Sequence, residues 1–173
     1  MRRRLRHIRI RTTAWVILRL AAYMACRPAW QDRTLAFMRR LADIAATRGR
    51  IGAAIDLADL GRQWQKAFGG KAKHPVTSVT ADTVYAEIHT NCPLRGTGDT
   101  HACWRMMEFD RAVLAKAGGE FVVLRSQAEP GVTVCQVAMR AARASLEDLV
   151  PAHVRAPASG RAAQPSMHEQ PTT

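Results

Sequence analysis

The chain has 173 residues, which suffice for one domain with a hydrophobic core and are too few for two comfortable ones. Its apolar fraction of 47% excludes wholesale disorder, and its four cysteines are too few for a disulfide scaffold, so we expect reduced thiols in a cytoplasmic protein. The net charge of +12 lies mostly at one end, because residues 1–50 contain 13 arginines, no lysine and two acidic residues.

Residues 1–30 predict a basic amphipathic segment. Six arginines lie among the first eleven residues, and Arg19 interrupts the apolar run that follows, which is then shorter than the roughly 20 residues of a membrane-spanning helix. One interpretation is a helix on an anionic membrane surface, peripheral on the inner membrane. Its apolar anchors would be Trp15, Val16, Ile17, Leu18 and Leu20. A solvated extension leading into a core helix is the alternative, and nucleic acid ranks last because no base-reading motif accompanies the arginines.

Residues 31–150 predict the folded domain. Apolar residues at three-residue steps predict a helix over 31–48, and a second apolar pattern predicts one over 51–68, ended by two glycines. A linker at 71–75 leads into the β-branched stretch 76–90, which predicts a strand with its even positions from 84 to 88 on one face.

The second half of the domain predicts a helix followed by a hairpin. Residues 100–119 form the helical pattern, with Thr100 as N-cap and two closing glycines. Residues 120–126 and 131–140 predict paired strands around a Pro-Gly turn, and a short helix over 141–150 follows. Residues 151–173 predict a disordered tail. N-terminal helices, then strand, helix and hairpin, indicate an α+β domain with a small antiparallel sheet packed on helices.

The stretch "IHTNCPLRGTGDTHACW", residues 88–104, has the densest set of reactive side chains. Its glycines favour a tight turn over a phosphate loop, because no lysine accompanies them. If the predicted strands are neighbours, Cys92, Cys103 and Cys135 converge, with His101 or His89 as a fourth ligand for zinc or an iron–sulfur cluster. The alternative is three separate cysteines, each buried in the core.

The same residues are candidates for nucleophilic catalysis. Cys103, in the first turn of a predicted helix, would have its thiol pKa lowered by the helix dipole. His89 or His101 would act as the base, oriented by a nearby carboxylate. Asp110 follows Cys103 by two helical turns on the same face, so the face is either a pocket wall or the site of a surface ion pair with a nearby arginine.

Residues 84–139 carry a strand ending in "NCPL", then "HACWRMMEFDR", then a glycine before "VTVCQVAMR". This order resembles the L-2-amino-thiazoline-4-carboxylic acid hydrolase-like family of small α+β bacterial proteins, and the lead-in "GRQWQKAF" is compatible with it. The resemblance implies hydrolytic opening of a thiazoline ring. A more distant likeness is to vinyl-reductase-like small-molecule-binding domains, which also carry functional cysteines. The basic N-terminal segment is a feature that a plain soluble hydrolase of this family would not have.

Three functions follow as hypotheses. The first is a hydrolase for a small sulfur- or nitrogen-containing molecule, and its predicted catalytic residues are Cys92, Cys103, His89, His101 and Asp110. The second is a sensor or accessory protein that binds a metal, a cluster or a small ligand, docked on a membrane through residues 1–30. Its predicted metal ligands are Cys92, Cys103, Cys135 and His101. The third is an interaction protein with a structural cysteine core.

Overall fold

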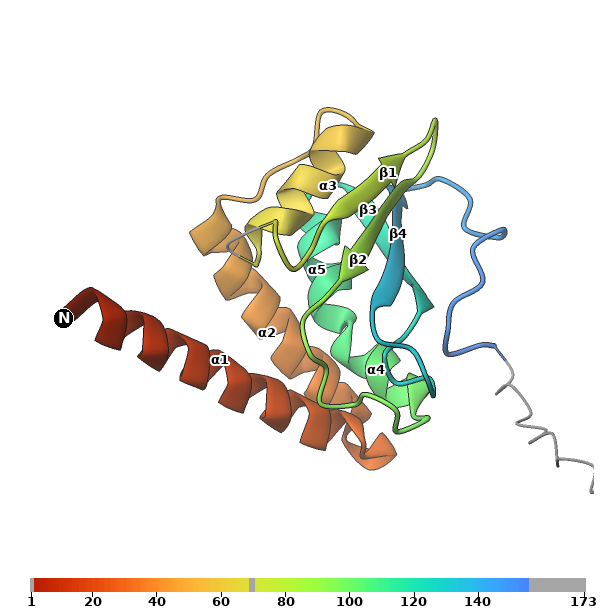
Figure 1. Ribbon diagram of the computed structural model, residues 1–173. Coiled ribbons are helices and arrows are strands. Elements are labelled where there is room, and N and C mark those ends of the chain that lie inside the picture. Colours follow the sequence, from red (N-terminus) through yellow and green to blue (C-terminus); the bar gives the residue numbers. More distant parts are fainter. Residues whose placement is uncertain (1, 69–70, 156–173) are drawn as a thin grey trace, which may run out of the picture.

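The computed structural model describes residues 2–68 and 71–155, with side chains from Thr13 onward (Figure 1). Five α-helices, one 3-10 turn and four strands make up this part of the chain. In order they are α1 (Arg2–Ala25), η1 (Pro28–Trp30), α2 (Gln31–Gly49), α3 (Leu57–Lys66), β1 (Val76–Val79), β2 (Val84–Ile88), α4 (Thr100–Met106), α5 (Glu108–Lys116), β3 (Gly119–Arg125) and β4 (Cys135–Ala141).

The four strands form one antiparallel sheet in the order β1-β2-β4-β3. The predicted hairpin is confirmed as β3 and β4, in which Val123 pairs with Val137. β2 pairs with the other edge of β4, so that Ile88 lies opposite Cys135. The predicted α+β class is therefore confirmed, and the pairing brings the end of β2 next to the start of β4.

Helices cover one face of the sheet and build the main core against it (Figure 1). Val84, Ala86 and Ile88 are buried on this face, as the alternation in the sequence predicts. Trp64 from α3 and Leu114 from α5 pack against them and are fully buried. α2 packs on α5 in a second helical layer.

The opposite face of the sheet is covered by the segment after β4, where a helix over 141–150 was predicted and is not formed. The guanidinium of Arg140 binds both carboxylate oxygens of Asp148 at 2.6 Å and donates to Thr83 Oγ1 at 2.7 Å. These bonds hold the segment as turns across the sheet. Leu149 is buried there beside Val122.

The predicted disordered tail begins later than residue 151. The Ala152 N–H donates to the Val123 carbonyl at 2.8 Å, and Ala152 is buried in the main core. Residues 151–155 therefore belong to the domain, because a backbone hydrogen bond and an apolar contact fix them to β3. Residues 156–173 lie outside the described residues.

Two predicted helices have different bounds in the structure. The helix predicted over 51–68 begins only at Leu57, because Asp56 accepts a hydrogen bond from the Asp59 amide at 2.6 Å and caps it. The helix predicted over 100–119 is interrupted at Met107, where the backbone leaves helical geometry between α4 and α5. Its N-cap is Asp99, which accepts from the Ala102 amide, and not Thr100 as predicted.

The single strand predicted over 76–90 is a hairpin of β1 and β2. Its turn is built by short polar side chains: Thr80 Oγ1 accepts from the Thr83 amide at 3.1 Å, and the Thr80 amide donates to the Thr83 carbonyl at 2.8 Å. Asp82 accepts from both threonine hydroxyls. Such local bonds favour a turn over a continuous strand.

α1 joins the domain through small residues near its end. Ala21, Ala22 and Ala25 are buried against α2 and α4, and the Arg105 side chain donates to the Ala25 carbonyl at 2.6 Å. The earlier part of α1 extends away from the sheet (Figure 1). No helix in the described part of the chain is long and apolar enough to cross a membrane.

The predicted membrane anchors of α1 divide into two groups. Trp15, Val16 and Leu20 are 42%, 59% and 48% exposed, which suits an outward-facing apolar stripe. Ile17 and Leu18 are half-buried and face a cavity of the domain instead. Docking on a membrane surface stays a prediction, and the side chains of residues 1–12 lie outside the description.

Candidate functional site

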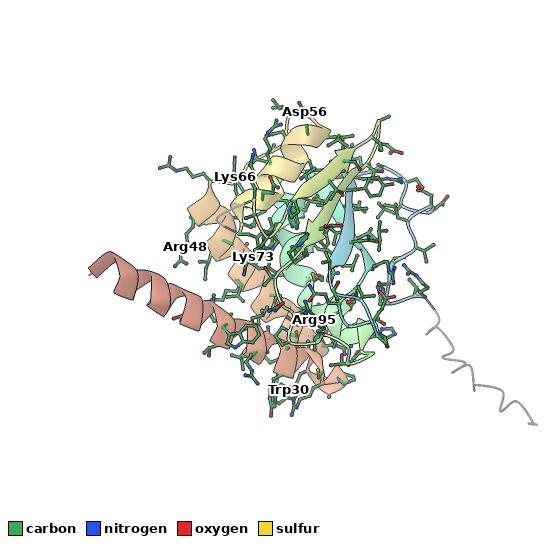
Figure 2. All side chains as sticks on the ribbon, in the orientation of Figure 1. Trp30, Arg48, Asp56, Lys66, Lys73 and Arg95 are labelled. Atoms are coloured by element: carbon green, nitrogen blue, oxygen red, sulfur yellow. The ribbon has the colours of Figure 1, made fainter. Side chains whose placement is uncertain are left out.

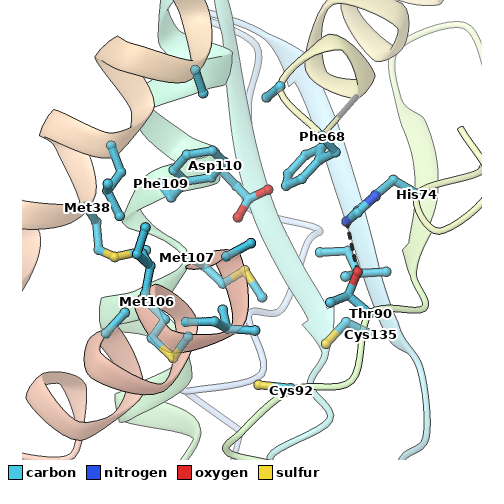
Figure 3. A pocket seen from close by; sticks show the side chains of 18 of the residues that line it. Met38, Phe68, His74, Thr90, Cys92, Met106, Met107, Phe109, Asp110 and Cys135 are labelled. Carbon is cyan, nitrogen blue, oxygen red and sulfur yellow. Dashed lines mark hydrogen bonds between the residues drawn. The ribbon is translucent and has the colours of Figure 1, made fainter. Parts of the chain in front are cut away.

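A cavity of about 620 Å³ lies between the helices and the start of β4 (Figure 3). α1 and α2 form one side, and α5 together with residues 66–68, 74 and 88–92 forms the other. Its lining is mostly apolar and includes Leu18, Met38, Leu41, Met106, Met107 and Phe109. A cavity of this size and character is typical of a site for a small organic molecule.

Asp110 lines the cavity and is 5% exposed. Trp64 Nε1 donates a hydrogen bond to Asp110 Oδ1 at 2.8 Å. Burial raises the pKa of this carboxyl to about 6, although the bond from Trp64 partly opposes the shift. The alternative from the sequence, a surface ion pair between Asp110 and a nearby arginine, is not formed. Asp110 belongs to the pocket wall.

His74 is the second buried titratable group of the cavity, and it was missed in the sequence because it lies in an apparent linker. Its ring stacks on Phe68 with centroids 3.9 Å apart, and Thr90 Oγ1 is 3.5 Å from its Nε2. Burial lowers the pKa of His74 to about 4, and Lys73 adds to the shift. The imidazole is therefore neutral at neutral pH. Figure 3 shows Asp110, Phe68 and His74 along one side of the cavity.

Two of the predicted thiols, Cys92 and Cys135, line the same cavity. Gln127 fixes both: its side-chain Oε1 accepts from the Cys92 backbone N–H at 3.2 Å, and its backbone N–H donates to the Cys135 thiol at 3.2 Å. Gln127 Nε2 also donates to the carbonyls of Ile88 and Thr90. Burial raises the pKa of Cys92, and that of Cys135 to about 11, so both are protonated thiols.

Cys103 does not join them in the cavity wall. It lines a separate pocket of about 150 Å³ with Trp104, Arg111 and His153. Burial raises the pKa of Cys103 to about 12, whereas the sequence predicted a lowered value. That prediction is wrong, because burial of the side chain outweighs the dipole of the short helix α4.

The two predicted histidines lie at the surface. His89 is exposed and pairs with Glu87 Oε2 at 2.7 Å. His101 is exposed on α4, with its ring centroid 5.9 Å from that of His153. Neither lines the cavity that contains Cys92, Cys135 and Asp110.

The predicted metal ligands are not arranged as a metal site. Across residues 2–68 and 71–155, no three His, Cys, Asp or Glu side chains are placed to hold a metal ion. His101 lies at the surface, and Cys103 faces a different pocket from Cys92 and Cys135. The zinc or iron–sulfur set of Cys92, Cys103, Cys135 and His101 is therefore not assembled here.

Two exposed cations mark where the cavity reaches the surface. Arg48, near the end of α2, and Lys66, at the end of α3, both line it (Figure 2). Lys66 Nζ donates to Gln63 Oε1 at 2.9 Å. The opening is thus basic, while the interior is apolar with one carboxyl.

No protein-family model matches this chain, and no curated protein or solved structure matches it either. The resemblance to the thiazoline hydrolase-like family therefore stays a prediction from the sequence.

Proposed function

We propose that this protein binds a small, largely apolar molecule in the cavity between α1, α2 and α5. The observation that carries the proposal is the cavity itself, about 620 Å³ with a mostly apolar lining. Inside the cavity the polar side chains are few, and Asp110, His74 and Thr90 lie on the side opposite α1 and α2. Few polar groups in an apolar cavity orient a ligand, while the apolar wall supplies most of the binding free energy.

A neutral environment-sensitive dye such as Nile red tests the proposal. Its fluorescence should rise and saturate at one dye per chain. Ala45 lines the cavity from α2, so Ala45→Trp should fill part of the space and weaken dye binding by about tenfold or more. Ala36 lies on the same helix, is exposed and does not line the cavity, so Ala36→Trp is the matched control. Equal dye binding by both variants would contradict the proposal.

A second proposal is hydrolysis of a small sulfur- or nitrogen-containing molecule, which the resemblance implies. The observation that favours it is a cavity carboxyl whose pKa, about 6, suits proton transfer near neutral pH. Asp110 would take a proton from an attacking water and return it to the leaving sulfur or nitrogen. The thiols are less suited to attack, because burial keeps them protonated.

Turnover of a thiazoline carboxylate tests this second proposal. Asp110→Asn should lower kcat by about a hundredfold or more, because general acid–base catalysis is lost while the acceptor for Trp64 Nε1 remains. Cys103→Ser should retain turnover, because Cys103 faces the other pocket. An Asp110→Asn variant with full activity would exclude Asp110 as the base.

A further inference from the structure

The charge balance inside the cavity is set by one residue. Of the described residues that line it, Asp110 is the acidic one, and the basic side chains, Arg48 and Lys66, are both exposed. The other buried titratable groups there are neutral at neutral pH, since burial lowers the pKa of His74 and raises that of Cys135. A ligand that enters deeply therefore meets a single carboxylate.

No ion pair joins this carboxylate to a cation within the described chain, although the charge of Arg111 lowers its pKa. The adjacent Arg111 is used elsewhere: it donates to Glu108 Oε2 at 2.9 Å and to the Trp104 carbonyl at 2.7 Å. Apart from its own amide, Asp110 receives one hydrogen bond from the described residues, from Trp64 to Oδ1. Oδ2 receives no side-chain hydrogen bond from the described residues, and Asp110 lines the cavity.

Aromatic rings line the cavity beside this carboxylate. Phe68 and Phe109 have centroids 5.7 Å apart at 60°, and both line the space that Asp110 faces. The faces of aromatic rings attract cations, and more strongly where water is excluded. A carboxylate together with two phenyl rings is a pattern that favours an ammonium group over a neutral or anionic one.

We propose that the cavity binds an organic amine in its protonated form, with the ammonium group at Asp110 Oδ2 beside Phe68 and Phe109 and the apolar body toward α1 and α2. The proposal rests on the cavity being a ligand site. Burial of an unpaired cation is strongly unfavourable, and Asp110 offsets this cost because folding has already removed most of the water around its carboxylate.

The basic opening does not reverse this preference. Arg48 and Lys66 are exposed, so water and salt screen their charges. Asp110 lies where water is excluded, and electrostatic interactions there are several times stronger. The two cations at the opening therefore affect the rate at which a cation enters, while Asp110 determines the affinity with which it is bound.

Three probes of the same shape test the proposal on the full chain at about pH 7: 4-phenylbutylamine, 4-phenylbutan-1-ol and 4-phenylbutyrate. Calorimetry and displacement of the neutral dye give their affinities. The amine should bind about tenfold or more tightly than the alcohol, as expected for a hydrogen bond between charged groups, and the acid should bind weakest. In NMR spectra the Nε1–H signal of Trp64 should shift with the amine and little with the alcohol.

Variants separate the charge from the shape. Asp110→Asn should remove the preference for the amine over the alcohol, while Asp43→Asn removes an exposed carboxylate of α2 and should leave that preference unchanged. The comparison of probes on the unmodified chain needs no variant to fold. Equal affinities for amine and alcohol, with the dye displaced by both, would overturn the proposal and leave the ligand site standing. Failure of the dye and all three probes to bind would overturn both.

Discussion

Trp64 Nε1 donates a hydrogen bond to Asp110 Oδ1 at 2.8 Å and so joins α3 to α5 beneath the sheet. The indole is fully buried, and it occupies one oxygen of a carboxyl that the fold has taken out of water. Trp64 thus holds the orientation of Asp110, which lines the cavity, and leaves Oδ2 without a side-chain donor from the described residues.

Asp110 and His74 should give opposite contributions to stability against pH. The pKa of Asp110 is raised from 3.8 to about 6, so its folded form favours the proton, and acidification from pH 7 stabilises the fold through this group. The pKa of His74 is lowered from 6.5 to about 4, so the same acidification destabilises the fold through His74. Each shift corresponds to roughly 3 kcal/mol, and the two largely cancel.

Single variants should expose each contribution. Between pH 7 and about 4.5, the free energy of unfolding of Asp110→Asn should fall relative to wild type, because the stabilisation from protonating Asp110 is lost while the opposing contribution of His74 remains. That of His74→Phe, which keeps the stacking on Phe68, should rise relative to wild type. Urea denaturation at each pH measures both, and parallel curves for all three proteins would contradict the assigned pKa shifts.

The thiols should react in the order of their burial. Cys26 is exposed, Cys92 is half-buried, and Cys103 and Cys135 are buried with raised pKa values. With Ellman's reagent at about pH 8, one thiol should react rapidly and the two buried thiols only in concentrated urea, because the thiolate is the reactive form. Cys26→Ser should remove the fast phase. A fast reaction that survives this substitution would show that half-buried Cys92 or one of the buried thiols is accessible to the reagent.

Gln127→Leu should lower the free energy of unfolding by about 2–4 kcal/mol. The fully buried amide of Gln127 bonds to the carbonyls of Ile88 and Thr90 and to the Cys92 amide, and leucine leaves these groups unpaired. Gln136 is exposed on β4, so Gln136→Leu is the matched control and should change stability little. Thermal and urea denaturation compare the two, and equal losses would contradict the central role of Gln127.

Gly119→Ala should destabilise the fold by about 1–3 kcal/mol, because a methyl group has no room there. An added Cβ would lie 2.7 Å from Leu60 Cδ1 and 2.9 Å from the Arg140 carbonyl oxygen. At Gly52 an added Cβ would meet nothing within 4 Å, so Gly52→Ala should be tolerated. The difference in melting temperature between the two variants checks the close packing of α3 on β3.

The fold was more predictable from the sequence than the site. The alternation from Val84 to Ile88 is a short-range pattern, and it predicted the buried face correctly. The helix expected over 141–150 failed because Arg140 and Asp148 bind each other across a turn, and such a tertiary contact overrides local propensity.

The site depends on burial and long-range contact, which a single sequence does not display. From its place on a helix face, Asp110 was predicted to be either a wall residue or part of a surface ion pair, and it lines the cavity. His74 precedes a proline in a polar segment, where no local pattern indicates that Phe68 will stack on it. Cys103 was expected to be reactive from its place in a helix, but burial reverses the direction of its pKa shift.

One wall of the cavity belongs to α1, which joins the domain through three alanines and the bond from Arg105 to the Ala25 carbonyl. A molecule bound in the cavity as proposed would contact Ile17 and Leu18 on one side and the sheet-side residues on the other, and would so bridge the helix to the domain. Binding of such a molecule and packing of α1 against the domain would therefore be thermodynamically linked. A partner that stabilises α1 in contact with the domain would raise the affinity of the protein for the molecule. By the same factor, the molecule would raise the affinity of the protein for that partner.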